Sequence, residues 1–356
     1  MLLVIFGAGA SFDSVPHLAP DARSIAPITY LQGRVLHNAD RPPLANQLFE
    51  DRPTFVAIMK EFADSLPIIP LLRGNVPVEQ QLAALEQQAQ KYPTRHRQLL
   101  AIRFYLHRVL WMCQRGWANH HKGITNYATF LDAIRRWREE LDERVCFVTF
   151  NYDTMLEEAM QQVLGMKFDA RGPVNNSLTS YIANPSYQLI KLHGSIDWGL
   201  EVSFPERPTS PQELIEHAAE LQVSNQFMKA GPNINFGNGS CGFPALAIPV
   251  QSKSQFMCPE THREALVTSL PVVTKIIAIG WRATEQHFLE MLKNRLTGLK
   301  GDVDLMVVSG DQKGMMETTN NLAIGPPRGT TRKRALRSNG FTGLINEIGH
   351  LETFLR

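Results

Sequence analysis

The chain has 356 residues, of which 44% are hydrophobic and 20% are charged, and this composition predicts a globular protein with one large domain or two moderate ones. Its 36 basic and 34 acidic residues leave a net charge of +2, so no global field selects nucleic acid or an anionic membrane as a partner. The sequence shows neither a signal-peptide pattern nor a run of 18 uncharged apolar residues. We therefore expect a soluble, cytoplasmic protein that binds no membrane.

The first eleven residues, MLLVIFGAGAS, predict a buried strand over residues 2–6 that runs directly into Gly7, Gly9 and Ser11. A parallel strand that ends in small residues lets the backbone N–H groups of the next helix point toward a phosphate. The segment therefore predicts a nucleotide site of an unusual type, because Phe12 stands where the dinucleotide fingerprint G-x-G-x-x-G has its third glycine.

Residues 44–142 have a different pattern, in which apolar residues recur with the 3.6-residue period of a helix. The pattern is clearest in LLAIRFYLHRVLWM from Leu99 and in YATFLDAIRRWREEL from Tyr127. This stretch predicts a helical insertion subdomain.

Four further apolar runs predict strands. They begin at Val145, Tyr187, Lys275 and Asp302, and the first three end in Asn151, Tyr152 and Asp153, in His193, Gly194 and Ser195, and in Gly280 and Trp281. Continuous apolar strands that alternate with helices predict an α/β fold with a Rossmann-like, doubly wound parallel sheet. Ligands of such sheets bind beyond the carboxyl ends of the strands, where these polar residues stand.

The remaining segments predict little regular structure. Residues between the third and fourth strands, with the run GPNINFGNGSCGFP, predict a loop-rich cover over the sheet. We assign residues 1–310 to one domain that contains the insertion, and residues 311–356 to a Gly/Pro/Arg-rich tail with a terminal helix. The basic run in this tail is either a solvated loop or a contact for nucleic acid or a partner protein; it consists of Arg328, Arg332, Lys333, Arg334 and Arg337.

The four cysteines lie far apart and form no C-x-x-C pair; they are Cys113, Cys146, Cys241 and Cys258. Zinc ribbons need paired cysteines, and disulfide frameworks belong to small secreted chains. The cysteines therefore predict free thiols and no bound metal.

Four segments together resemble the sirtuins: GAGAS at residues 7–11, TFNYD at 149–153, KLHGS at 191–195 and IGWRATEQHF at 279–288 occur in sirtuin order. The sequence lacks the two cysteine pairs of the deacylase zinc ribbon and the Pro-Asp-Phe-Arg motif that follows the first glycines in deacylases. It is therefore more similar to the zinc-free, sirtuin-like branch found in bacterial antiphage defence, whose members hydrolyse NAD.

This resemblance implies roles for individual residues. Asn151 would orient the attacking water, His193 would be the ribose-facing acid or base, and Asp153 would orient the site or stabilise positive charge on the ribose. The other implied NAD-binding residues are Gly7, Ala8, Gly9, Ala10, Ser11, Tyr152, Gly194, Ser195, Gly280, Trp281 and Glu285, with His287 as a weaker candidate. Taken singly, Asn151 is equally suited to cap a helix, and His193 to be a satisfied core histidine.

We therefore predict an NAD glycohydrolase that forms nicotinamide and ADP-ribose as the gated effector of an antiphage system. The resemblance implies homo-oligomers and, in some systems, a separately encoded helicase-like ATPase or Argonaute partner. The alternative is a non-catalytic regulatory module that senses NAD or ADP-ribose. A serine hydrolase that uses Ser11, Asp153 and His193 is disfavoured, because the G-x-S-x-G elbow is absent.

Overall fold

The computed structural model describes residues 1–15, 24–25, 35–36, 41–74, 76, 78–89, 91–121, 123–168, 178–204, 207–248, 256–296, 303–322 and 333–356. Within these ranges, no helix combines the length and the apolar character that a membrane crossing requires.

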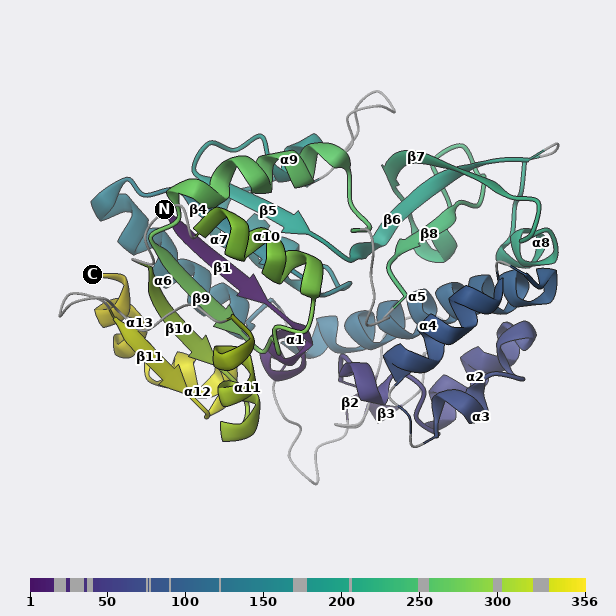
Figure 1. The fold of residues 1–356 in the computed structure, drawn as a ribbon, viewed down its shortest axis with the longest axis horizontal. Coiled ribbons are helices and arrows are strands. Elements are labelled where there is room, and N and C mark those ends of the chain that lie inside the picture. Colours follow the sequence, from purple (N-terminus) through teal and green to yellow (C-terminus); the bar gives the residue numbers. More distant parts are fainter. Residues whose placement is uncertain are drawn as a thin grey trace.

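A six-stranded parallel sheet lies in the left half of the molecule in Figure 1, with the strand order β11-β10-β9-β1-β4-β5. Its strands are β1 (Leu2–Phe6), β4 (Val145–Thr149), β5 (Tyr187–Lys191), β9 (Lys275–Ile279), β10 (Asp304–Val308) and β11 (Arg334–Arg337). Every neighbouring pair is parallel, so all carboxyl ends meet at one edge. The predicted α/β class with a parallel sheet is confirmed.

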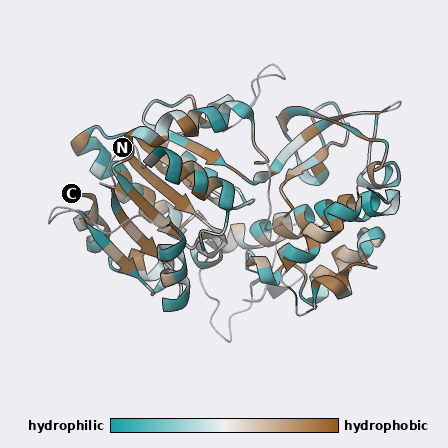
Figure 2. Cartoon of the chain, in the orientation of Figure 1, coloured by the Kyte–Doolittle hydropathy of each residue, from teal (hydrophilic) through white to brown (hydrophobic). Residues whose placement is uncertain are grey.

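The strands form because both faces of the sheet are covered. Strands β1, β4 and β10 are buried at every residue, and the central strands are the continuous brown bands of Figure 2. Helices α9 (Glu260–Ser269) and α10 (Gln286–Leu296) cover one face, while α6 (Asn126–Leu141) and α7 (Met155–Leu164) cover the other (Figure 1).

The predicted helical insertion divides into two parts. Helices α2 (Pro53–Glu61), α3 (Ile69–Leu72), α4 (Val78–Ala89) and α5 (Pro93–His121) form a group beside the sheet (Figure 1). Helix α6 instead packs on the sheet itself, where Tyr127 and Phe130 meet the ring of Phe6 at centroid distances of 5.1 and 5.8 Å. The same helical periodicity thus serves two different packing surfaces.

Helix α5 is 29 residues long and connects the helical group to the rest of the protein. Its buried His107 donates an Nε2–H to the Ile196 carbonyl at 2.7 Å, since a carbonyl oxygen only accepts. Further along the helix, Gln114 exchanges two hydrogen bonds with Thr154, at 2.6 and 2.9 Å.

The prediction of a loop-rich cover between the third and fourth predicted strands is wrong in part, because this segment contains most of a second sheet. Strands β6 (Gly194–Ser203), β7 (Gln222–Lys229) and β8 (Phe243–Leu246) form this antiparallel sheet in the order β7-β6-β8, and helix α8 (Pro211–Glu216) lies between the first two in the chain. The chain passes from the parallel sheet to this one at Gly194, whose φ is 83°. A Cβ there would overlap the Ala245 carbonyl oxygen, so the junction requires glycine. The strands β2 (Ser24–Ile25) and β3 (Val35–Leu36) form a separate short antiparallel pair.

Residues beyond 310 do not stand apart from the sheet. They form α11 (Gln312–Leu322), the edge strand β11, α12 (Gly340–Asn346) and α13 (Ile348–Leu355), and β11 pairs with β10 from Leu305 opposite Arg334. The predicted tail therefore completes the sheet. Of the basic run, Arg328 and Arg332 lie outside the described residues, while Arg334 and Arg337 belong to β11.

Candidate functional site

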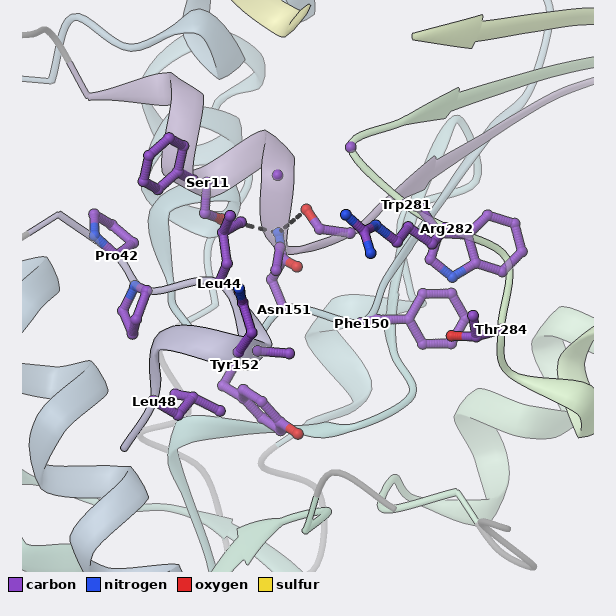
Figure 3. Close-up of a pocket in the computed structure, with 18 of the residues that line it drawn as sticks. Ser11, Pro42, Leu44, Leu48, Phe150, Asn151, Tyr152, Trp281, Arg282 and Thr284 are labelled. Atoms are coloured by element: carbon purple, nitrogen blue, oxygen red, sulfur yellow. Dashed lines mark hydrogen bonds between the residues drawn. The ribbon is translucent and has the colours of Figure 1, made fainter. Parts of the chain in front are cut away.

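A cavity of about 1200 Å³ lies at the carboxyl ends of the parallel strands. Residues predicted for the site contribute to its lining from four separate loops: Gly7, Ala8, Gly9, Ser11, Asn151, Tyr152, Asp153, His193, Gly280, Trp281 and Glu285. The segment that precedes α2 contributes residues such as Pro42, Leu44 and Leu48 to the opposite wall (Figure 3). Ala10, Gly194 and Ser195 are buried and are not among the residues that line the cavity.

Asn151 is held tightly at the bottom of the cavity and is only 6% exposed. Its Nδ2 donates to the Gly7 carbonyl at 2.9 Å and to Ser11 Oγ at 2.9 Å (Figure 3). The Gly7 carbonyl accepts only, so it fixes which end of the amide is nitrogen. The Oδ1 atom is buried and has no hydrogen-bond partner among the described residues. A buried acceptor without a hydrogen bond costs about 1–3 kcal/mol of stability, and a ligand that donates a hydrogen bond to this oxygen would remove that cost.

The glycines of the GAGAS motif allow the backbone that follows β1 to contact the backbone that follows β9. A Cβ on Gly7 would lie 2.6 Å from both the Gly280 carbonyl oxygen and the Trp281 Cα. The amides of Gly7 and Gly9 donate to the carbonyls of Ile279 and Gly280, each at 3.0 Å. The expectation that these N–H groups point at a phosphate is therefore wrong for Gly7 and Gly9, because both are already paired.

Asp153, rather than Asn151, supports the start of the following helix. Its Oδ1 accepts from the Met155 amide at 3.1 Å, where α7 begins. The buried Lys191 ammonium donates to the Asp153 carbonyl and pairs with Glu157 Oε1 at 2.8 Å. Burial raises the pKa of the Glu157 carboxyl, and Lys191 opposes that rise. This buried ion pair fixes the backbone of the loop that carries Asn151.

His193 lies in an aromatic corner of the cavity and is 5% exposed. Its ring meets Phe150 edge-on at 4.8 Å and lies 6.1 Å from the ring of Tyr152. Phe150 in turn stacks on Trp281 at 5.2 Å, with an angle of 12° between the rings. The corner therefore offers a flat apolar wall next to an imidazole.

Glu285 orients this wall, since its Oε2 accepts from Trp281 Nε1 at 2.5 Å. His287 also lines the cavity and is exposed.

Two polar residues at the site were not predicted from the sequence. Tyr127 reaches it from α6, with its hydroxyl 2.9 Å from Ser11 Oγ and 3.1 Å from Asn151 Nδ2. Arg282 is exposed, lines the cavity beside Trp281 (Figure 3), and its guanidinium has no hydrogen bond or ion pair with any described residue. Helical periodicity marks Tyr127 only as a core residue, and a lone arginine after a strand is common on surfaces.

Metal ligands are not grouped in the part of the chain that the structure describes: no three His, Cys, Asp or Glu side chains are placed to hold an ion. The four cysteines are buried and unpaired by disulfides.

No family model and no curated protein matches the chain. Among solved structures, it is similar to a mutant Sir2 homologue in complex with ADP-ribose, at 15% sequence identity and a TM-score of 0.41. The similarity covers 100% of this chain and 91% of that one. An identity this low says nothing about the chemistry of the site.

Proposed function

We propose that the chain binds NAD and hydrolyses it to nicotinamide and ADP-ribose. One observation carries the proposal: the four segments with sirtuin-like sequences line a single cavity, and the buried amide oxygen of Asn151 has no partner among the described residues. The cavity volume of about 1200 Å³ slightly exceeds the range of about 300–1000 Å³ that is usual for small-molecule sites. A dinucleotide needs a site of this size.

The reaction breaks the bond between the nicotinamide nitrogen and the anomeric carbon of the ribose, and the electron pair leaves with nicotinamide. Water then forms a new C–O bond and loses a proton. Asn151 Oδ1 is suited to accept a hydrogen bond from this water, because its Nδ2 is already occupied. His193 is suited to accept the proton. The carboxylate of Asp153 favours the positive charge that develops on the ribose.

The stacked rings of Phe150 and Trp281 provide a surface for a planar heterocycle beside His193. We assign the nicotinamide to this wall. Glu285 supports the assignment indirectly, because it holds the indole of Trp281 in place.

We further propose that the activity is gated, and that the protein acts in the cytoplasm as a homo-oligomeric antiphage effector with a helicase-like ATPase or Argonaute partner. The sirtuin resemblance supports this proposal, as does the harm that uncontrolled NAD hydrolysis would do to the host cell. Full activity of the purified monomer without any partner would contradict the gating.

The test is to incubate the purified protein with NAD and to follow nicotinamide and ADP-ribose by chromatography. We expect Asn151→Ala and His193→Ala each to lower turnover by about 100-fold or more, with circular dichroism unchanged. Asn294→Ala, on the exposed side of α10, and His217→Ala, after α8, are matched controls outside the cavity. Release that neither cavity substitution changes would refute the assigned site. NAD binding without release, in vitro and in expressing cells, would favour the sensing module instead.

A further inference from the structure

The hydroxyl of Tyr127 forms hydrogen bonds with two polar side chains of the site, and the chemistry of these partners determines which atom donates in each bond. Tyr127 is 1% exposed, and burial raises the pKa of its phenol well above the usual value, so the hydroxyl keeps its proton. Among the described residues it has two partners, Ser11 Oγ and Asn151 Nδ2. Tyr127 belongs to α6 and lies outside all four sirtuin-like segments.

Only one of these partners can accept the phenol proton. Asn151 Nδ2 is an amide nitrogen that donates and does not accept, and its identity is fixed by the Gly7 carbonyl at 2.9 Å. A buried hydroxyl proton needs an acceptor. Tyr127 therefore donates to Ser11 Oγ.

The proton of Ser11 is then left for the ligand. Ser11 Oγ accepts from Tyr127 at 2.9 Å. It also accepts from the second N–H of Asn151 Nδ2, which it shares with the Tyr127 oxygen at 2.9 and 3.1 Å, so both lone pairs of Ser11 Oγ face a donor. Its own O–H has no acceptor among the described residues, and Ser11 lines the cavity.

We propose that Tyr127 fixes Ser11 as a hydrogen-bond donor to the ligand, so that this position selects a phosphate oxygen, which carries no proton. Tyr127 is thus a positioning residue, and Ser11 is the residue that touches the ligand. The inference rests on the proposed function, in that the ligand is taken to be NAD or its product ADP-ribose. A ligand hydroxyl would be a poorer occupant, because its proton would find no lone pair on Ser11.

The test is a double-mutant cycle on binding, which does not depend on turnover. Calorimetry gives the Kd of ADP-ribose for the wild type, Ser11→Ala, Tyr127→Phe and the double variant. We expect each single substitution to weaken binding about five- to tenfold, and the double variant to be no weaker than Ser11→Ala alone. Tyr187→Phe is the control, because this buried tyrosine starts β5 at the opposite end of the sheet.

The outcomes separate the two proposals. Additive losses in the double variant, or an unchanged Kd for Tyr127→Phe, would overturn the positioning role. An unchanged Kd for Ser11→Ala would overturn the inference even if Tyr127→Phe failed to fold. Repeating the Ser11→Ala titration with ADP, which lacks the second ribose, should give the same fold-loss, and a loss confined to ADP-ribose would overturn the phosphate assignment. Absence of ADP-ribose binding to the wild type would overturn the proposed function as well.

Discussion

Replacement of Gly280 with alanine should destabilise the protein and weaken ligand binding, because two site loops meet there backbone to backbone. Gly280 has a φ of 61°, and this left-handed region costs a residue with a side chain about 1 kcal/mol or more. The new Cβ would overlap the Ala10 amide nitrogen and lie 2.6 Å from the Gly9 carbonyl carbon, whereas ordinary contact is 3.4–4 Å. Backbone atoms cannot rotate away, and crowding of this kind costs about 1–3 kcal/mol. The expected loss in the free energy of unfolding is therefore about 2–4 kcal/mol.

Gly165 provides a control that separates the two contributions. Its φ is 65°, but a Cβ there would meet no atom within 4 Å. Gly165→Ala should therefore cost only about 1 kcal/mol, and the difference between the variants measures the contact of the two loops. Urea unfolding followed by tryptophan fluorescence gives both values, and calorimetry with ADP-ribose should show weaker binding for Gly280→Ala alone. Equal destabilisation by the two substitutions, with equal binding, would refute the reasoning.

Two further predictions concern titration and charge. Burial lowers the pKa of His107 and of His262 to about 4, whereas in the unfolded chain a histidine takes up its proton near pH 6.5. The unfolded state therefore binds more protons than the folded state between pH 6.5 and 4, and the free energy of unfolding should fall by roughly 3 kcal/mol per histidine as the pH drops through that window. In urea titrations, the free energy of unfolding of His107→Gln and of His262→Gln should fall less steeply with pH than that of the wild type. An unchanged pH dependence in both variants would contradict the lowered pKa values. Arg282→Ala should raise the Kd of ADP-ribose about tenfold at unchanged Tm, because its guanidinium lines the cavity without a described partner. Arg295→Ala, exposed on α10 outside the cavity, should leave both unchanged, and equal effects of the two substitutions would show that Arg282 makes no specific contact.

Strands that are buried on both faces could be predicted from the sequence because their apolar runs are uninterrupted. The predicted starts at Leu2, Val145, Tyr187 and Lys275 coincide with β1, β4, β5 and β9. Strand β11, with the sequence RALR, carries two arginines and is partly exposed at the sheet edge, so no apolar run announces it. Strand β7 is likewise mostly polar and half-exposed. Edge and surface strands are stabilised by pairing, which a sequence pattern does not display.

The candidate site could be predicted from the sequence where residues stand one or two positions after a buried strand. Asn151, His193 and Gly280 stand at such positions, and the topology brings their loops together at one cavity. Tyr127 reaches the site because α6 packs against β1, where its ring contacts Phe6 and its hydroxyl contacts Ser11. Helical periodicity does not specify such a tertiary contact. The pairing of the Gly9 amide was hidden for the same reason, because its acceptor lies on a loop far along the chain.

Helix α5 connects the helical group to the antiparallel sheet and to the loop that follows β4. At 1.5 Å per residue, its 29 residues span about 44 Å, which makes it a rigid rod through the molecule. It is fastened by His107 to the antiparallel sheet and by Gln114 to the loop that follows β4. These hydrogen bonds join the helical group to the antiparallel sheet and to the loop that carries Asn151, and the regions should therefore melt in one cooperative transition.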